Sequence, residues 1–447
     1  MGLENLMVEN VNLSILLFLF LTLLTATSLI CFNFDFLQPS CIFDFTMTIS
    51  MFLGVVNITK WNLFVGTDTV IIVVVGMVCF NLGSYYVRDI LLNTVFRERQ
   101  NCAEIVYRIR YWAVILFAAV MAFFAYCSIS DMYRASLSLG NQTGLSNMIK
   151  TVRYALESGA FKFSRAMRYR NLIAISVSTI SAFLLINNII AKGKINCKES
   201  IILSLPLFTF IPFLVLSTGR RSFVHFIIML CVFSGILYQR KQCNTIKSRL
   251  KLLKFLSIAG LFSIISYFVL GHLTGKVVSA ERSHFTIISH YGGLSIPALN
   301  QYLSQVRVEN QYIGQNILKG IYGNLNSLGF HLTPGRDFLP FVQFYGEEYI
   351  NTNVYSVFYR QVTDLSVPGM LLAMIICGII MTALYEILKR ENRPILLSMY
   401  AQCGYIPFFL FIDDQFMGVI ATSTLYCTLM MWLFFKCFII KEKNERT

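Results

Sequence analysis

The chain has 447 residues, of which 56% are apolar, 14% are aromatic and only 13% are charged. A water-soluble fold of this composition would expose more apolar surface than soluble proteins carry, so a soluble enzyme or binding protein is excluded. The net charge of +14 would suit a nucleic-acid-binding protein, but most basic residues lie between long apolar runs rather than in one patch. The composition therefore predicts a membrane protein whose partners include membrane lipid and no nucleic acid.

Apolar runs long enough to cross a bilayer as a helix, about 20 residues each, recur along the sequence. A β-barrel would instead show shorter segments of alternating apolar residues, and no such pattern repeats. The runs predict an all-α polytopic membrane protein with about 11 transmembrane helices (10–12) and one large periplasmic loop. The predicted helices cover 12–32, 41–58, 66–87, 112–130, 171–191, 201–217, 222–238, 255–270, 368–388, 395–412 and 416–437.

The distribution of basic residues predicts the orientation of these helices. More than half of the 37 Lys and Arg residues lie in four short connectors and the C-terminal tail, which the positive-inside rule places in the cytoplasm. The loops 131–170 and 271–367 then face the periplasm of a bacterial inner membrane, and neither contains a cysteine. Three parts follow: an N-terminal bundle of about eight helices (1–270), the large periplasmic loop (271–367), and about three C-terminal helices with a tail (368–447).

The loop 131–170 conflicts with this orientation because it is itself basic. It carries seven cations, Arg153 among them, against Asp131 and Glu157. Either the topology differs there, or the cations meet an anion such as a phosphate or an acidic sugar.

Two arginines at a tight turn form the sharpest local feature of the sequence. Arg220 and Arg221 lie in Ser217–Ser222, between two apolar helices on the predicted outer face. Placing a guanidinium in or near the apolar layer of the membrane costs free energy, so it needs a partner. Its geometry and charge match those of phosphate oxygens. The pair is therefore predicted to bind an anion; the alternative is a pair that reaches the lipid head groups.

The large periplasmic loop concentrates residues that bind anions or transfer protons. Histidine titrates near neutral pH and can accept a proton from a sugar hydroxyl, although most loop histidines are simply surface residues. The candidates are Arg282, His284, His290, Arg307, His331, Arg336 and Arg360. The segment Ser295–Lys319 has a helix-like apolar stripe, which either lies on the membrane surface or packs against the bundle.

Aromatic residues are also frequent in this loop, and aromatic rings stack on sugar rings while Asn reads hydroxyl groups. Tyr355 and Asn351 are candidates for such contacts, with core packing as the alternative. Asp413 and Asp414 at the outer end of a predicted helix could line a cavity, although a solvated helix end is the simpler interpretation.

Nucleotide and metal sites are not predicted. The segment Gly271–Lys276 lacks the spacing of a phosphate-binding loop and its following Ser or Thr, and no C-x-x-C pair is present. An enzyme of this sequence would need no cofactor, and its substrate would bring its own leaving group.

The layout and two segments resemble the O-antigen polymerase family (Wzy), the oligosaccharide repeat unit polymerases. Ser217–Phe226 is similar to the family's Gly-x-Arg stretch, which opens a membrane span. Asn351–Gly369 is similar to its Asn-x-Tyr-Thr stretch followed by Asp-Phe-Gly and a second Gly. Asp364 and Gly369 match that pattern, whereas Leu365 and Ser366 replace the aromatic residue and the first Gly.

The resemblance implies a periplasmic-face glycosyltransferase that polymerises undecaprenyl-pyrophosphate-linked oligosaccharide repeat units into O-antigen polysaccharide for lipopolysaccharide. Arg220, Arg221 and Arg360 would then hold the donor's pyrophosphate, and one of His284, His290 or His331 would activate the acceptor hydroxyl, with Asp364 a further catalytic candidate. A chain-length regulator and a flippase are the protein partners that it implies.

Two other functions fit the sequence less well. An O-antigen ligase has a similar architecture but transfers the glycan to the lipid A core. A non-enzymatic lipid-linked oligosaccharide flippase or transporter would favour paired repeats and short outer loops, against which the long loop 271–367 argues.

Overall fold

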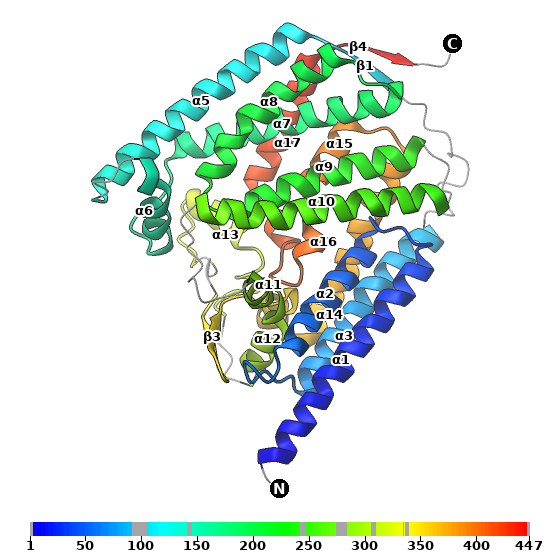
Figure 1. The fold of residues 1–447 in the computed structure, drawn as a ribbon, viewed down its shortest axis with the longest axis vertical. Helices are drawn as coiled ribbons and strands as arrows, with labels where there is room; N and C mark the ends of the chain where they lie inside the picture. The colour runs from blue at the N-terminus through cyan, green and yellow to red at the C-terminus, as the bar shows by residue number, and fades with distance from the viewer. Residues whose placement is uncertain are drawn as a thin grey trace. The chain divides into compact units, whose positions relative to one another are not determined.

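The computed structural model describes residues 3–91, 105–140, 145–241, 246–273, 284–304, 310–333, 335 and 339–444. In these ranges nine helices are long and apolar enough to cross a membrane, which confirms the predicted class of an all-α, multi-pass membrane protein. Helices dominate the ribbon, and the strands described form two short antiparallel pairs (Figure 1).

The chain folds into two compact units, each assembled from three segments. Unit 1 comprises Met1–Arg99, Ala280–Ile387 and Ile406–Thr422, and unit 2 comprises Gln100–Ser279, Leu388–Tyr405 and Ser423–Thr447. The predicted linear division at residues 270 and 367 does not coincide with these units. Apolar runs show where spans lie but carry no information about which spans become neighbours.

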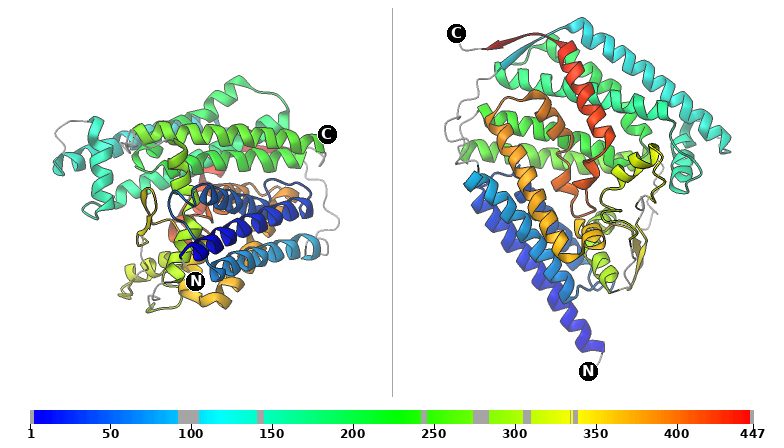
Figure 2. Two further views of the ribbon diagram at one scale, coloured as in Figure 1. Left: turned by 60° about the horizontal axis from the view of Figure 1, so that its bottom comes forward. Right: turned by 180° about the vertical axis from the view of Figure 1, so that it is seen from behind.

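Unit 1 is built on four long helices, of which α1, α2 and α3 lie side by side (Figure 2). These helices are α1 (Leu3–Cys31), α2 (Pro39–Val56), α3 (Thr67–Tyr85) and α14 (Val357–Arg390), which belongs to the unit as far as Ile387. The shorter elements are η1 (Tyr86–Leu91), α11 (His284–Gly293), α12 (Ser295–Leu303), α13 (Lys319–Ser327), β2 (Val342–Tyr345), β3 (Tyr349–Thr352), α16 (Ile406–Phe409) and η2 (Met417–Val419).

Unit 2 contains the remaining long helices and one pair of strands. Its elements are β1 (Ile105–Ile109), α5 (Tyr111–Ser138), α6 (Leu145–Glu157), α7 (Arg165–Lys192), α8 (Cys197–Leu216), α9 (Arg220–Lys241), α10 (Ile246–Leu273), α15 (Pro394–Gln402), α17 (Thr422–Phe438) and β4 (Ile439–Asn444). α9 lies between α7 and α10 and packs against each of them (Figure 1). β1 and β4 pair antiparallel and join a connector to the tail, a contact that the sequence did not predict.

Nine of the eleven predicted helices correspond to the nine long helices, and the last two need correction. The predicted helix 395–412 is two short helices, α15 and α16, separated by a turn at Cys403–Tyr405. In that turn Gly404 packs closely against Val232, where a Cβ would lie 2.7 Å from the Val232 Cγ2 atom. The predicted helix 416–437 begins later, as α17, and has 17 residues.

The basic loop 131–170 is largely helical, because α5 and α7 extend into it and α6 lies between them. Met132, Met148, Val152, Met167 and Leu216 form a buried cluster that fastens α6 to its neighbours. The Arg170 guanidinium forms an ion pair with the Asp131 carboxylate. The described part of this loop is therefore a packed helical part of unit 2.

In the described part of the segment Ser295–Lys319, α12 forms the start, residues 310–318 are not helical, and Lys319 begins α13. Ile296 and Leu299 are fully buried, so packing against the bundle, rather than a membrane-surface helix, is the correct alternative for this part. The Asn300 side-chain oxygen accepts hydrogen bonds from the Gly66 amide (2.7 Å) and the Thr69 hydroxyl (2.8 Å), which fixes α12 to the start of α3.

Glycines bring the backbones of α3 and α14 into direct contact. A Cβ at Gly83 would lie 2.3 Å from the Ile375 carbonyl oxygen, and a Cβ at Gly378 would lie 2.1 Å from that of Phe80. The Ser84 hydroxyl donates to the Gly378 carbonyl oxygen at 3.3 Å. Small residues at helix crossings are a common basis of packing in membranes.

We expect Gly378→Ala to lower the free energy of unfolding in detergent by about 2–3 kcal/mol, because the methyl group forces the two backbones apart. Gly260→Ala in α10 is the matched control. A Cβ at Gly260 meets nothing within 4 Å, so the higher helix propensity of Ala should stabilise the protein slightly. Equal melting temperatures for the two variants would contradict the proposed role of the contact.

Candidate functional site

The turn between α8 and α9 in unit 2 presents the two predicted arginines. Thr218 adopts a left-handed conformation (φ 56°), and the Ser217 hydroxyl donates to the Leu214 carbonyl oxygen at 2.7 Å. α9 then begins at Arg220, so that Arg220 and Arg221 are its first two residues. Consecutive residues at a helix start point in different directions, and the two side chains have different surroundings.

Arg220 is enclosed by α10. Only 6% of its surface is exposed, and its guanidinium carbon lies 4.7 Å from the centre of the Tyr267 ring. A Cβ at Gly271 would come within 2.5 Å of the same guanidinium carbon, so a larger residue there would displace the Arg220 side chain. This cation–π contact links the start of α9 to α10. Arg220 therefore has a structural contact that its sequence pattern did not reveal.

Arg221 is exposed and is held by two aromatic side chains. Its Nε donates a hydrogen bond to Nε2 of His225 at 3.0 Å. The His225 ring stacks on the Tyr405 ring with centroids 3.7 Å apart and planes at 8°, and the Arg221 guanidinium carbon lies 5.8 Å from the Tyr405 centroid. Since Nε2 accepts, the imidazole carries its hydrogen on Nδ1. His225 was not among the predicted site residues, although its spacing of four residues from Arg221 on one helix face could have indicated the pair.

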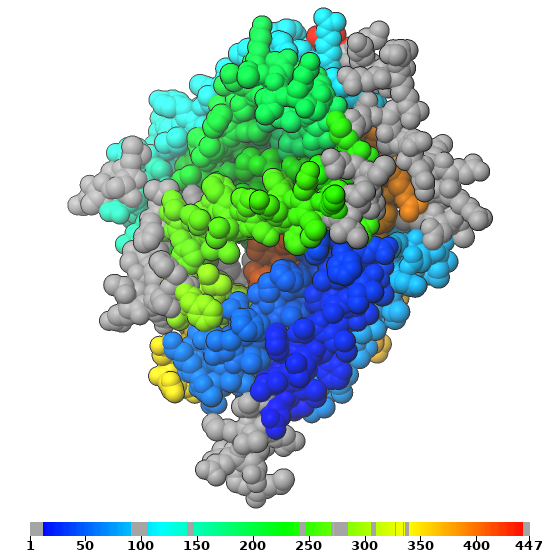
Figure 3. Space-filling view, turned by 45° about the vertical axis from the view of Figure 1, so that its right-hand side comes forward, coloured from blue at the N-terminus to red at the C-terminus, as the bar shows by residue number. Residues whose placement is uncertain are grey.

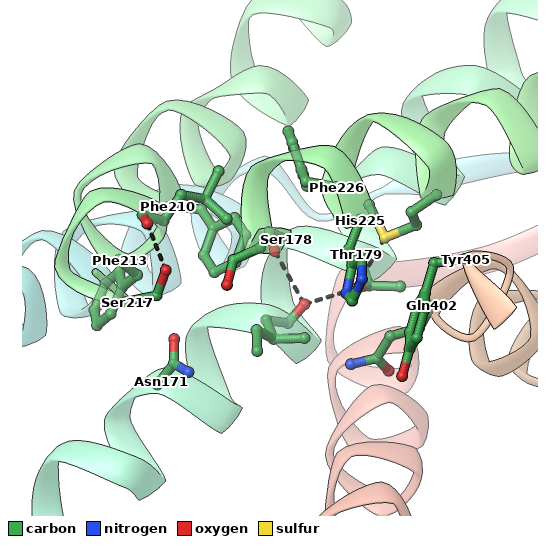
Figure 4. Close-up of a pocket in the computed structure, with 14 residues that line it drawn as sticks. Asn171, Ser178, Thr179, Phe210, Phe213, Ser217, His225, Phe226, Gln402 and Tyr405 are labelled. Atoms are coloured by element: carbon green, nitrogen blue, oxygen red, sulfur yellow. Dashed lines mark hydrogen bonds between the residues drawn. The ribbon is translucent and has the colours of Figure 1, made fainter. Parts of the chain in front are cut away.

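A cavity of about 170 Å³ lies beside this group, between α7, α8, α9 and α15 (Figure 4). Its lining combines aromatic and aliphatic side chains with uncharged polar groups and contains no Asp, Glu, Lys or Arg. The aromatic residues are Phe210, Phe213, Phe226 and Tyr405, and the polar ones are Asn171, Ser178, Thr179, Ser217, Ser222, His225 and Gln402.

The polar groups of this cavity differ in what they already bind. The hydroxyls of Ser178 and Thr179 both donate to the Ile175 carbonyl oxygen, at 3.0 and 2.7 Å. The amide side chains of Asn171 and Gln402 enter from opposite sides of the cavity (Figure 4). Amides and aromatic faces without charges suit a hydroxyl-bearing ring, and the exposed guanidinium beside them suits an anion.

Arg360 and Asp413 form a bidentate ion pair in unit 1. Arg360 Nε donates to one Asp413 oxygen at 2.6 Å and Nη2 to the other at 3.1 Å, and Arg360 is only 2% exposed. Arg360, which was predicted to bind pyrophosphate, thus already binds the Asp413 carboxylate through Nε and Nη2. Asp413 and Asp414 are not a solvated helix end, as the simpler interpretation had it, because both contact α14.

Asp414 is buried next to this pair. It accepts hydrogen bonds from the Gln361 amide at 3.0 Å and the Met417 backbone at 3.0 Å. Burial raises the pKa of Asp414 to about 6, the two hydrogen bonds oppose this shift, and the neighbouring Asp413 adds to it. Two consecutive residues of α14, Arg360 and Gln361, thus bind two consecutive aspartates, Asp413 and Asp414.

Asp364 anchors the segment that precedes α13. One carboxylate oxygen accepts the side-chain amides of Asn310 and Asn316, both at 2.8 Å, and the other accepts the backbone amides of Asn316 and Ile317, both at 2.7 Å. Four donors match the acceptor capacity of a carboxylate. This geometry suits a residue that holds the loop in place better than a residue that accepts a proton from substrate.

Ser366 lies at a break in α14 between Asp364 and Pro368. Its φ of 61° and ψ of 178° belong to a region that essentially only glycine adopts without strain. The chain therefore keeps, at Ser366, the backbone conformation that a glycine would favour.

We expect Ser366→Gly to raise the free energy of unfolding by about 1 kcal/mol, because glycine adopts this conformation without the Cβ penalty. Ser366→Ala, which keeps the penalty, should show no such gain. The measurement is thermal unfolding of both variants in the same detergent. A stabilising Ala variant would mean that the hydroxyl, rather than the backbone, limits stability.

The histidine candidates of the large loop differ in placement. His290 Nε2 lies 2.6 Å from the Asn351 carbonyl oxygen and must donate to it, so two predicted residues are brought together. His331 is exposed and left-handed (φ 45°), and His284 begins α11. Tyr355 is 1% exposed and donates to the Pro340 carbonyl oxygen, which supports core packing over sugar binding for this residue.

Four predicted arginines of the two long loops remain. Arg153 on α6 is 6% exposed, and its guanidinium carbon lies 4.8 Å from the Tyr154 ring centre. Arg282, Arg307 and Arg336 lie outside the described residues. Among the residues that the structure describes, no group of three His, Cys, Asp or Glu side chains is arranged as metal ligands are.

Comparison with known proteins assigns no family to this chain. No family model, no curated protein and no solved structure matches it. Its function must be argued from the two side-chain groups, Arg221–His225–Tyr405 with its cavity in unit 2 and Arg360–Asp413 with Asp364 in unit 1.

Proposed function

We propose that the chain is an O-antigen polymerase, a periplasmic-face glycosyltransferase that joins oligosaccharide repeat units linked to undecaprenyl pyrophosphate. The observation that carries the proposal is the exposed guanidinium of Arg221, oriented by His225 and Tyr405 beside an uncharged, aromatic cavity. A lipid-linked glycan presents the complementary groups: a lipid tail, an anionic pyrophosphate and an uncharged sugar ring.

Arg221 would bind the pyrophosphate of the donor. Its hydrogen bond to His225 fixes the guanidinium plane, so that little side-chain entropy remains to be lost when an anion binds. Arg220, which packs against Tyr267 of α10, would stabilise the turn rather than contact substrate. Arg360, predicted as a further pyrophosphate ligand, would serve the fold through Asp413.

In the proposed reaction the acceptor hydroxyl oxygen forms a bond to C1 of the donor glycan, and the bond from C1 to the pyrophosphate oxygen breaks. The electron pair leaves with undecaprenyl pyrophosphate, whose growing charge the Arg221 guanidinium would stabilise. The hydroxyl proton would pass to water or to a basic side chain. No nucleotide is consumed, since the lipid pyrophosphate is itself the leaving group.

Surface lipopolysaccharide from a strain that lacks the gene tests the proposal. We expect a single repeat unit on the lipid core and no ladder of longer chains. Loss of every repeat, with lipid-linked precursor intact at the outer face, would identify a ligase instead. Precursor held at the inner face would identify a flippase, and an unchanged ladder would refute all three functions.

A further inference from the structure

A second, larger cavity lies at the opposite end of unit 2 from the α8–α9 turn. It has a volume of about 450 Å³ and lies between the last turns of α7 and α9 and the first turns of α10. Ile186 and Ile190 line it from α7, Ser234 and Tyr238 from α9, and Lys251 and Phe255 from α10. Each pair is four residues apart, so each helix presents one face to the cavity.

The lining is almost entirely apolar, with polar groups only at Ser234, Tyr238 and Lys251. Lys251 is exposed, and it lies five residues into α10, about 8 Å along the helix from its first residue. A lysine at this depth extends its ammonium group toward the head groups while its methylenes stay in the apolar layer. The cavity therefore combines a mostly apolar lining with one cation, the exposed Lys251.

The helix that forms one wall of the cavity is exposed to the surrounding medium. Only 11% of the residues in an 18-residue apolar stretch within Lys247–Val269 are buried, and α10 lies on the surface in the space-filling view (Figure 3). In a membrane protein that medium is lipid. Lys247, Arg249, Lys251 and Lys254 all lie at this end of α10, which the positive-inside rule assigns to the cytoplasmic leaflet.

We propose that this cavity binds one acyl chain of an anionic phospholipid of the cytoplasmic leaflet, with the lipid phosphate on Lys251. Basic pockets between transmembrane helices on the cytoplasmic side are known to select anionic head groups. The cavity volume lies in the range of roughly 300–1,000 Å³ typical of ligand sites. The bound lipid would fasten α10, which otherwise packs mainly on α9, to α7 and α9.

The test compares Lys251→Gln with the matched control Lys254→Gln, which removes the same charge from the same helix outside the cavity lining. Each full-length protein is purified in mild detergent from membranes containing phosphatidylglycerol, and the retained lipid is measured by native mass spectrometry. We expect Lys251→Gln to lower retention about fivefold, which corresponds to ~1 kcal/mol for one cation at an anionic membrane surface. Lys254→Gln should retain the wild-type amount.

Ser234→Trp provides an independent variant, since an indole would fill the cavity without changing charge. It should abolish retention and also abolish the rise in melting temperature that added phosphatidylglycerol gives the wild type. Equal loss of lipid in the Lys251 and Lys254 variants would show diffuse attraction and overturn the proposal. Unchanged retention in Ser234→Trp would show that no acyl chain enters the cavity and would overturn it too.

Discussion

Arg221→Ala is expected to abolish the lipopolysaccharide ladder, a loss of at least 100-fold in polymer, while the protein still inserts in the membrane. The exposed guanidinium is the group that we propose to bind the donor pyrophosphate and to stabilise its charge as it leaves. Removing one such preorganised contact costs roughly 2.7–4 kcal/mol of barrier in other enzymes. The measurement is ladder length in a deletion strain that expresses the variant, with membrane levels of the protein matched to wild type.

Arg221→Lys keeps the charge but loses the fork and the Nε donor to His225, so we expect partial activity. Lys254→Ala, at the far end of unit 2, is the control for loss of a cation and should leave the ladder intact. Arg220→Ala should instead lower the amount of folded protein, because it empties the space beneath Tyr267 and Gly271. A full ladder in Arg221→Ala would remove the basis of the pyrophosphate assignment.

Asp413→Ala is expected to lower the free energy of unfolding by about 3–5 kcal/mol, because it leaves the charge of Arg360 buried without its bidentate partner. Glu348→Ala is the matched control in the same unit. The Lys60–Glu348 pair is well exposed, with 35% and 48% of the side chains accessible, so its loss should cost less than about 1 kcal/mol. Thermal unfolding in detergent measures both.

The double variant Arg360→Met with Asp413→Leu separates structure from catalysis. Replacing a buried ion pair by apolar side chains of similar volume is often neutral for stability, so the double variant should recover most of the loss. If Arg360 serves only the fold, the recovered protein should also make polymer. A stable double variant without a ladder would show that Arg360 has a role in the reaction beyond the fold.

The apolar runs predicted the long helices well, because burial in lipid requires each span to satisfy its own backbone hydrogen bonds. They did not predict the break at Cys403–Tyr405, because Gln402, Gly404 and Pro407, which favour a break there, lie within a run that is otherwise apolar. Nor did they predict that Asp413 meets Arg360, a pairing of residues 53 positions apart that depends on how the helices pack.

The candidate site was predictable to a similar extent. The turn at Arg220 and Arg221 was found from charge alone, but the sequence could not tell the enclosed guanidinium from the exposed one. That difference depends on Tyr267 and Gly271, about fifty residues later in the chain. His225 was not predicted because it lies inside an apolar run, where a single polar residue does not by itself indicate a site.

The interleaved segments of the two units impose an order on biosynthesis. Helices α1 to α3 enter the membrane first, but α14, whose Gly378 packs against α3, follows only after about 270 further residues (86–356) have been made. At about 5–20 residues per second, this leaves the first three helices without their partner for on the order of fifteen to fifty seconds. During that interval the glycine surface of α3 is open to lipid or to an insertion chaperone, and a chain cut short before α14 would insert but never complete unit 1.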